Sequence, residues 1–475
     1  MLFRSIFLRK MKFSNDVNLI LPQPCKCMLQ SFKGTFSAFF VKKCDPNRSR
    51  YMLIQFSVKN WRSVRDEQIL SLVKARGEEL AETNTFTPDT PHCSDLLNSA
   101  VIYGANAAGK SNLLSALRAM KEIILESATK QPDDELPVVS FKLDSETEKL
   151  PTELEMTFIV DKVKYQYGFT ASASQIFDEW LIAYPNGRPQ KWFTRSYDTV
   201  TNSYDWSTGS NLLGQKQVWQ DSTRSNSLFL STATQLNSKQ LKPILNWFRN
   251  TLRVSSMVGW HGTYTASICG KPEQKLKVLN FLKAADFDIK DLNIKAEAIS
   301  LKHLPESIPE DIRQKFIEEM SGGEIYDIKT IHEGAQGQLI EFEFDDESDG
   351  TQKLFSFAGP WIDVLENGRV LFVDELHDNL HPKLVKFLVN LFHDKASNPH
   401  NAQLIFTTHE TSILSQDVFR RDQIWFCEKD DKQATKLYPL SDFSPRKGRE
   451  NLEEAYLTGR YGALPYTRPY RVVTS

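Results

Sequence analysis

The sequence predicts an α/β fold with a mostly parallel central sheet, an antiparallel β subdomain and a helical insertion. In the last third of the chain, buried strands at 370–373 and 403–408 flank a helix at 382–394, an order typical of a parallel sheet with both faces covered. Residues 151–207 alternate apolar and polar positions, which indicates antiparallel sheet. Residues 211–320 show mostly helical spacing, so a helical insertion is expected between the two halves of the α/β domain.

Composition narrows the class of protein further. The chain has 475 residues, of which 40% are hydrophobic and 25% are charged, the balance of a globular protein with a sizeable core. Its 58 basic residues nearly balance its 60 acidic ones, so the overall charge favours neither nucleic acid nor an anionic membrane. No apolar run reaches the roughly 18 residues of a membrane-spanning helix, and the cysteines lack metal-ligand spacing. We therefore expect a cytoplasmic protein with reduced thiols and no membrane partner.

The chain divides into four predicted segments. Residues 1–51 differ from the rest in composition, and an orderly strand pattern begins at Met52, so 1–51 is expected to be a poorly ordered extension or a wrongly assigned start. Residues 52–210 are expected to hold the first half of the α/β domain and the antiparallel subdomain. The helical insertion spans 211–320, and residues 321–475 return to the α/β domain and end in a tail.

A glycine-rich loop lies between the apolar run 97–103 and a helical pattern. Gly104-Ala-Asn-Ala-Ala-Gly109-Lys110-Ser111 matches G-x-x-x-x-G-K-[ST] in full, in the strand and helix context that this motif requires. Backbone N–H groups of such a loop surround phosphates, the lysine supplies charge for binding and catalysis, and the serine hydroxyl is a Mg²⁺ ligand. The predicted ATP-binding residues are Gly104, Ala105, Asn106, Ala107, Ala108, Gly109, Lys110, Ser111 and Asn112, with Mg²⁺ as the expected metal.

Two further patterns supply the remaining catalytic candidates. The apolar strand 370–373 ends in Asp374 and Glu375, and a carboxylate at the end of a parallel strand faces the ligand crevice. Asp374 is the predicted Mg²⁺ ligand, and Glu375 is the predicted base that polarises the attacking water. His409 follows the second buried strand, where a side chain can contact the γ-phosphate edge and hold the water in line.

These three elements, in this order, resemble the ATP-binding-cassette (ABC) ATPases, including their chromosome-maintenance and RecF-like branch. The resemblance implies an ABC-type P-loop NTPase fold and a homodimer or higher oligomer, in which a signature segment of one copy completes the ATP site of the other. Ser321-Gly-Gly-Glu324 is the closer match in letters to that segment, but strand pattern follows it. Ser348-Asp-Gly350 precedes a helical pattern and then the Asp-Glu strand, so Ser348 and Gly350 are the predicted signature residues. Residues 378–381 correspond to the loop that crosses the dimer interface.

Two positions bear on how complete this resemblance is. The glutamine that these ATPases carry between the two halves has no counterpart, because Ser140-Phe-Lys142 stands about where it belongs. Arg62, in Asn-Trp-Arg-Ser, matches the Asn-Phe-Arg of RecF-like and Rad-type heads, where the arginine approaches the nucleotide.

From Met52 to the end the chain resembles more narrowly the ATPases of abortive-infection and restriction-linked loci, the AbiL and Rlo group and the ATPase subunit of the PARIS system. The residues that carry this likeness are MLIQFSVKNWRSVRDE, GANAAGKSN, SDGTQKLF, DELHDNLHP and YLTGRYGALPY. The resemblance implies an anti-phage ATPase with a separately encoded effector, often a nuclease, and a nucleic-acid or phage-protein trigger. No D-x-D follows His409, so a nuclease on this chain is not expected. A DNA repair or recombination ATPase of RecF type is the alternative, and the ATPase subunit of a transporter is a third.

Overall fold

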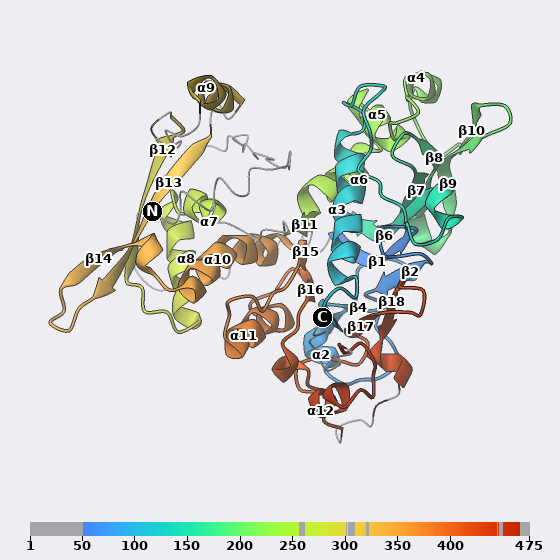
Figure 1. The fold of residues 1–475 in the computed structure, drawn as a ribbon. Coiled ribbons are helices and arrows are strands. Elements are labelled where there is room, and N and C mark those ends of the chain that lie inside the picture. The colour runs from blue at the N-terminus through green and yellow to red at the C-terminus, as the bar shows by residue number, and fades with distance from the viewer. Residues whose placement is uncertain are drawn as a thin grey trace, which may run out of the picture. The chain divides into compact units, whose positions relative to one another are not determined.

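The computed structural model describes residues 51–255, 262–300, 302, 309–319, 323–443, 445 and 450–465 (Figure 1). These residues fall into two compact units. The small unit comprises the described residues of Gly262–Ser348, and the large unit comprises those of Asp45–His261 and Asp349–Ser475. The division differs from the expected insertion at 211–320, because residues 211–255 belong to the large unit and residues 323–348 belong to the small one. The predicted segment 1–51, apart from Tyr51, lies outside the described residues.

An antiparallel sheet forms the β subdomain of the large unit, as the alternating pattern predicts. Its order is β10-β9-β8-β7-β6-β1-β2, with every neighbouring pair antiparallel. The strands are β1 (Tyr51–Lys59), β2 (Gln68–Ser71), β6 (Thr152–Val160), β7 (Val163–Ala171), β8 (Ile176–Tyr184), β9 (Gln190–Asp198) and β10 (Ser203–Thr208). The face that carries Leu154, Met156 and Phe158 is buried, because side chains two positions apart share one face of a strand.

The central sheet of the large unit is mostly parallel, so the predicted α/β fold class with a mostly parallel central sheet is confirmed. Its order is β11-β15-β16-β5-β17-β18, and only the β17–β18 pair is antiparallel. The strands are β5 (Ser99–Gly104), β11 (Leu252–Val254), β15 (Val370–Val373), β16 (Gln403–Thr407), β17 (Ile424–Lys429) and β18 (Thr435–Pro439). Strands β5, β15 and β16 are buried along their whole length, which explains their continuous apolar runs.

Helix α3 (Lys110–Glu126) joins the two sheets through one hydrophobic core. Leu113, Leu117, Met120 and Ile124 recur at helical spacing and are buried in a cluster that also holds residues of β1, β6 and β5. The other helices of the large unit are α2 (Ala81–Asn84), α4 (Lys216–Asp221), α5 (Phe229–Gln235), α6 (Lys242–Asn246), α10 (Asp349–Asn367), α11 (Pro382–His393) and α12 (Leu452–Leu457). A short pair, β3 (Thr85–Phe86) and β4 (Leu96–Leu97), precedes β5.

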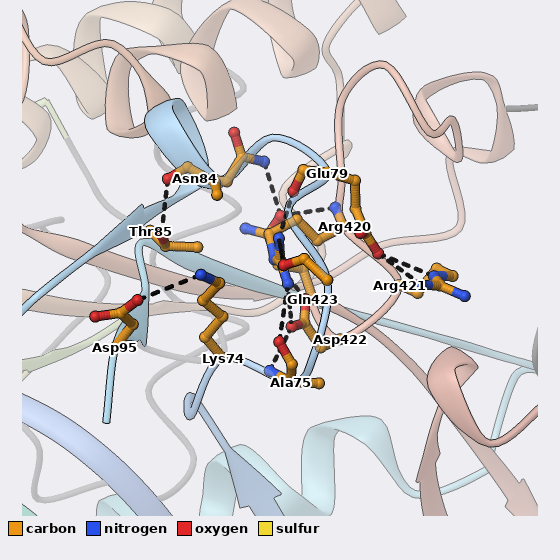
Figure 2. Close-up of polar contacts among 12 residues, drawn as sticks. Lys74, Ala75, Glu79, Asn84, Thr85, Asp95, Arg420, Arg421, Asp422 and Gln423 are labelled. Atoms are coloured by element: carbon orange, nitrogen blue, oxygen red, sulfur yellow. Dashed lines mark hydrogen bonds and ion pairs between the residues drawn. The ribbon is translucent and has the colours of Figure 1, made fainter. Parts of the chain in front are cut away.

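A buried polar cluster fastens the loop after β2 to the turn that leads into β17 (Figure 2). The Arg420 guanidinium is 1% exposed and donates two hydrogen bonds to the Asp422 carboxylate, at 2.9 and 2.8 Å. It also donates to the backbone carbonyls of Gly77 and Glu79, while Asp422 accepts from the backbone N–H of Ala75 at 2.7 Å. The loop and β17 are therefore held together by a paired charge, and β17 lies beside β5.

The small unit combines an antiparallel sheet with short helices. Its sheet order is β12-β13-β14, with β12 (Asp291–Ala298), β13 (Glu324–Glu333) and β14 (Leu339–Glu343), and its helices are α7 (Thr263–Ile268), α8 (Pro272–Ala284) and α9 (Glu310–Glu319). The helical interpretation of 211–320 did not foresee β11 or β12. Strand β12 pairs with β13 along its whole length, so its backbone partners come from outside the segment. Within the described residues, no helix is both long and apolar enough to span a bilayer.

Candidate functional site

The glycine-rich loop connects the end of β5 to the start of α3 in a conformation that depends on its glycines. Gly109, immediately before α3, has a φ of 113°, and a Cβ there would collide with the Thr435 hydroxyl. A Cβ on Gly104 would collide with the backbone carbonyl of Cys427. Ala107 also has a positive φ, of 62°. The loop therefore turns back over β17 and β18 and brings the N-terminus of a long helix to the end of β5, a ready-made anion site.

Lys110 is a buried cation at the base of this loop. Its side chain is 6% exposed, and its Nζ donates to the carbonyl oxygens of Gly104 at 2.8 Å and Ala105 at 3.1 Å. Burial lowers the pKa of the Lys110 ammonium, while the charges of Glu375 and Asp374 act in the opposite direction. The ammonium is thus held by neutral carbonyls next to a helix N-terminus, an environment that phosphate oxygens suit better than carbonyls do.

Side chains from distant parts of the sequence support the loop from behind. The Thr435 hydroxyl on β18 donates to the Ala108 carbonyl at 2.8 Å and lies 2.8 Å from the Ser63 hydroxyl. The Asn112 amide donates to Ser63 Oγ at 2.7 Å. Cys427 Sγ on β17 lies 3.5 Å from the same Ala108 carbonyl, and burial raises the pKa of this thiol to about 12. The Cys427 thiol is therefore protonated at neutral pH and packs against the loop at Ala108.

The acidic pair lies at the carboxyl end of β15, as predicted. Thr407, on the neighbouring strand β16, links the two residues: its hydroxyl donates to Asp374 Oδ1 at 2.6 Å and accepts from the backbone N–H of Glu375 at 2.8 Å. Thr407 is fully buried, Asp374 is half-buried and Glu375 is exposed. Glu375 has a φ of 51°, an uncommon conformation for a residue with a side chain. The turn thus directs the two carboxylates differently, one inward and one to solvent.

His409 and His377 face each other beside Lys110. His409 Nε2 lies 3.1 Å from Lys110 Nζ, and burial together with the Lys110 charge lowers the pKa of His409 to about 4. His409 is therefore neutral at neutral pH and accepts from the ammonium. The His377 ring lies 5.5 Å from the His409 ring, centre to centre, and its Nδ1 accepts from the His409 backbone N–H at 3.5 Å. Burial also lowers the pKa of His377.

The predicted signature residues lie at the start of α10. Gly350 is the second residue of α10, and Ser348 precedes the helix and is exposed. Glu347, one residue earlier, accepts from Thr330 and lies 2.6 Å from His332 Nε2, both on β13. Figure 1 shows α10 beginning well away from α3. Of the competing Ser321-Gly-Gly-Glu324, Ser321 and Gly322 lie outside the described residues, and Glu324 begins β13 rather than a helix.

A salt bridge connects α10 to the loop after the acidic pair. Lys353 Nζ, one turn into α10, lies 3.2 Å from Asp378 Oδ2, and the same ammonium sits 5.5 Å from the centre of the Phe357 ring. Asp378 belongs to the predicted interface loop 378–381. The salt bridge therefore links the first turns of α10 to the loop that follows Glu375.

Arg62 lies in a tight turn after β1 and is exposed, with a φ of 47°. Its backbone N–H donates to the Val139 carbonyl at 2.8 Å. The neighbouring Asn60 holds residues 141–150 through its side-chain amide. This amide accepts a hydrogen bond from the Phe141 N–H and donates to the carbonyls of Thr147 and Leu150. The segment without the expected glutamine is thus anchored to this turn. Ser63, next to Arg62, contacts Asn112, so the turn lies along the start of α3.

A family model described as "AAA domain, putative AbiEii toxin, Type IV TA system" matches residues 99–415, more than half of the chain. The chain belongs to this AAA-domain family. The matched range begins at β5 and includes the glycine-rich loop, the acidic pair and His409. Comparison with curated proteins gives no match.

Solved structures similar to this AAA-domain protein include SMC head domains and the recombination mediator protein RecF. The SMC head domain from Thermotoga maritima is 11% identical, with 82% of this chain and 98% of that chain covered and a TM-score of 0.36. An SMC head bound to the C-terminal winged-helix domain of ScpA is 13% identical, with 82% and 97% covered and a TM-score of 0.35. The recombination mediator RecF with ATP is 13% identical, with 76% and 94% covered and a TM-score of 0.32. At these values the likeness supports no inference about residues, and the family assignment rests on the family match.

Several residues of this AAA-domain site are absent from the sequence-based candidates. Thr407, His377, Ser63, Thr435 and Cys427 all contact predicted residues or the loop itself. Thr407 lies two residues before His409, and His377 lies two residues after Glu375, so their closeness in sequence to predicted site residues could have identified them. Ser63 and Thr435 meet across 372 positions of sequence and carry no local signal.

Proposed function

We propose that this chain is an ATPase that binds Mg-ATP on the loop 104–112 and hydrolyses it. The single observation that carries the proposal is the buried Lys110 ammonium, held by carbonyls of a complete phosphate-binding loop and facing the charges of Asp374 and Glu375. The donor set suits the metal as well, because a serine hydroxyl and a carboxylate are oxygen ligands of the kind that Mg²⁺ takes. The family match supports a nucleotide-binding role for the same range.

Each candidate residue has a role that its surroundings support. Lys110 exchanges its hydrogen bonds to the Gly104 and Ala105 carbonyls for bonds to phosphate oxygens. Ser111 and Asp374 would hold Mg²⁺, which would neutralise phosphate charge when bound. Glu375, exposed at the mouth of the strand, takes a proton from water. His409, kept neutral by burial and by Lys110, orients that water and responds to the γ-phosphate. Asn106, Asn112 and Arg62 complete the nucleotide contacts.

The complete site needs a second copy of the chain. Gly350 and Ser348 lie at the start of α10, whose N-terminal N–H groups suit the γ-phosphate of another copy. The Lys353–Asp378 salt bridge would carry closure of that interface to the Glu375 turn. We therefore propose a homodimer, or a higher oligomer, that ATP closes through Ser348 and Gly350.

The biological role that we propose is control of a toxic effector in anti-phage defence. The motif likeness to ATPases of abortive-infection loci supports it, and the matched family's description as a toxin of type IV systems points to the same class of loci. The effector is separately encoded, and a nucleic acid or a phage protein is the trigger. A repair or recombination ATPase of RecF type is the alternative outcome of the test.

The test is the particle mass of the Glu375→Gln protein with and without Mg-ATP, purified together with the product of the adjacent gene. Removal of the base should lower hydrolysis by roughly 10²–10⁴-fold and leave ATP binding intact. Glu82→Gln, an exposed change on α2, is the matched control and should hydrolyse normally. ATP-driven dimers or larger assemblies that retain the neighbour's product support the defence role. A monomer that gathers only on added duplex DNA, in a salt-dependent way, supports the alternative.

A further inference from the structure

A surface cavity lies on the β17–β18 hairpin, where the chain returns after α12. Its volume is about 320 Å³, and it is lined by Glu428, Tyr438, Asp442, Phe443, Tyr461 and Gly462. Gly462 has a φ of 68°, and a Cβ there would lie 2.7 Å from Glu428 Oε2 and 2.8 Å from the Tyr438 hydroxyl. A glycine is therefore needed at position 462 for the chain to pass close to Glu428 and Tyr438.

Three aromatic rings form the walls of this cavity. The ring centres of Tyr438 and Phe443 are 5.7 Å apart with an interplanar angle of 50°, and those of Phe443 and Tyr461 are 5.4 Å apart at 68°. The Tyr438 hydroxyl donates to the Tyr461 carbonyl at 3.0 Å, which fixes two of the rings against each other. Tyr461 is fully buried and stacks on Phe426, so the half-buried rings of Tyr438 and Phe443 are the ones that a ligand in the cavity can reach, and their quadrupoles attract a cation.

Two carboxylates line the same cavity. Glu428 Oε2 accepts from the Ala463 backbone N–H at 2.9 Å, and Asp442 is exposed at the rim. Neither Glu428 nor Asp442 forms an ion pair with any residue that the structure describes, although Lys436 lies opposite Glu428 in the strand register. Arg460, which lies close in sequence, pairs with Glu450 instead. The cavity thus combines negative charge with aromatic faces, a combination selective for organic cations.

We propose that this cavity binds the side chain of an arginine or lysine presented by a partner protein. Its volume is at the small end of ligand pockets, a size suited to one side chain rather than a nucleotide. The two carboxylates supply charge-assisted hydrogen bonds, and the half-buried rings of Tyr438 and Phe443 supply faces against which a guanidinium packs.

The same hairpin also supports the ATP-binding loop. Cys427 and Thr435, next to Glu428 and three residues before Tyr438, contact the Ala108 carbonyl. Phe426 stacks on Tyr461 at 5.5 Å, and Tyr103 of β5 donates to the carbonyl of Glu410, the residue after His409. Occupation of the cavity is therefore transmitted to both the loop and His409. This coupling rests on the proposed ATPase function, whereas binding itself does not.

The binding test uses the full chain titrated with Nα-acetylarginine amide, followed by calorimetry or by NMR of the ligand. The matched probe is Nα-acetylcitrulline amide, which has nearly the same shape without the charge. We expect saturable binding of the arginine probe at least roughly tenfold tighter than that of citrulline, and its loss in Phe443→Ala and in Glu428→Gln. Phe177→Ala, at a ring pair on β8, and Asp205→Asn, an exposed carboxylate on β10, are the matched control variants and should bind as the unmodified chain does.

Three outcomes overturn parts of the proposal. Equal binding of both probes, or binding that Phe443→Ala leaves unchanged, would show that the cavity is no cation site. Binding that appears only after Arg446, Lys447, Arg449, Arg468 and Arg471 are replaced by glutamine would assign the occupant to this chain instead of a partner. An unchanged rate of ATP turnover at saturating probe would remove the coupling but not the site, and an absence of turnover altogether would count against the proposed ATPase alone.

Discussion

Thr407 offers the sharpest test of how the fold sets the acidic pair. Its buried hydroxyl donates to Asp374 Oδ1 at 2.6 Å and accepts from the Glu375 N–H at 2.8 Å, so Thr407→Val removes both bonds with almost no change of shape. A lost bond to a charged group is worth about 1.5–3 kcal/mol, and an unpaired buried N–H costs about 1–3 kcal/mol. Because Asp374 is half-buried and Glu375 is exposed, hydrogen bonds to water replace part of the lost free energy. We expect the free energy of unfolding to fall by about 2–4 kcal/mol.

The same substitution should impair hydrolysis more than ATP binding. Without the hydroxyl the Glu375 turn loses its anchor, and a small displacement of a catalytic group lowers kcat by roughly tenfold to a hundredfold. The Lys110 contacts with Gly104 and Ala105 do not involve Thr407, so the affinity for ATP should stay within about twofold. The assay is phosphate release in parallel with binding of a fluorescent ATP analogue, and Thr407→Ser is the control that keeps the hydroxyl. A normal kcat in the valine variant, or an equal loss in the serine variant, would refute the reasoning.

Three other predictions concern strain, buried charge and pH. Glu375→Gly should abolish hydrolysis yet raise the free energy of unfolding by about 1 kcal/mol, because glycine adopts the φ of 51° without strain. A urea titration in which this variant is less stable than the unmodified chain would contradict the prediction. Arg420→Ala should lower that free energy by about 3–5 kcal/mol, since it leaves Asp422 buried without its partner, whereas the exposed Arg76→Ala should have little effect on the urea midpoint. Burial lowers the pKa of His393 to about 4, below its unfolded value of about 6.5. Between these two pH values the unfolded chain therefore binds one proton more than the folded chain, and the free energy of unfolding falls as the pH falls through that window. In His393→Gln, urea titrations from pH 7 to 4 should show a pH slope smaller by up to about 1.4 kcal/mol per pH unit, and an unchanged slope would exclude His393 as the source.

Elements with a strong local pattern agree between sequence and structure. The apolar runs that became β5, β15 and β16 are buried on both faces, and a strand of that kind needs no partner information to be recognised. The alternation over 151–207 likewise specifies antiparallel strands with one buried face. The helical pattern expected after Gly350 is present as α10, although the helix already begins at Asp349.

Elements whose pairing is non-local are where the sequence-based expectations fall short. Strand β12 lies in a segment with helical spacing, and β13 supplies all its partners from beyond residue 323. The boundary of the small unit at Ser348 falls between the two predicted signature residues, because residues 323–348 associate with β12 and not with the sheet of β15. No composition change marks that position.

By itself the sequence determined the glycine-rich loop between a strand and a helix, the acidic pair at a strand end, and the classes of the two sheets in the large unit, because each depends on residues within one turn or one strand. Only the tertiary structure decided what surrounds Lys110 and Asp374: the neutral His409 beside the ammonium, Thr407 between two strands, and the Ser63–Thr435 contact behind Gly109. It also brought Glu428, Tyr438 and Tyr461 to one cavity. The physical reason is that burial and hydrogen-bond partners set pKa and orientation, and these partners come from strands that meet only after the chain has folded.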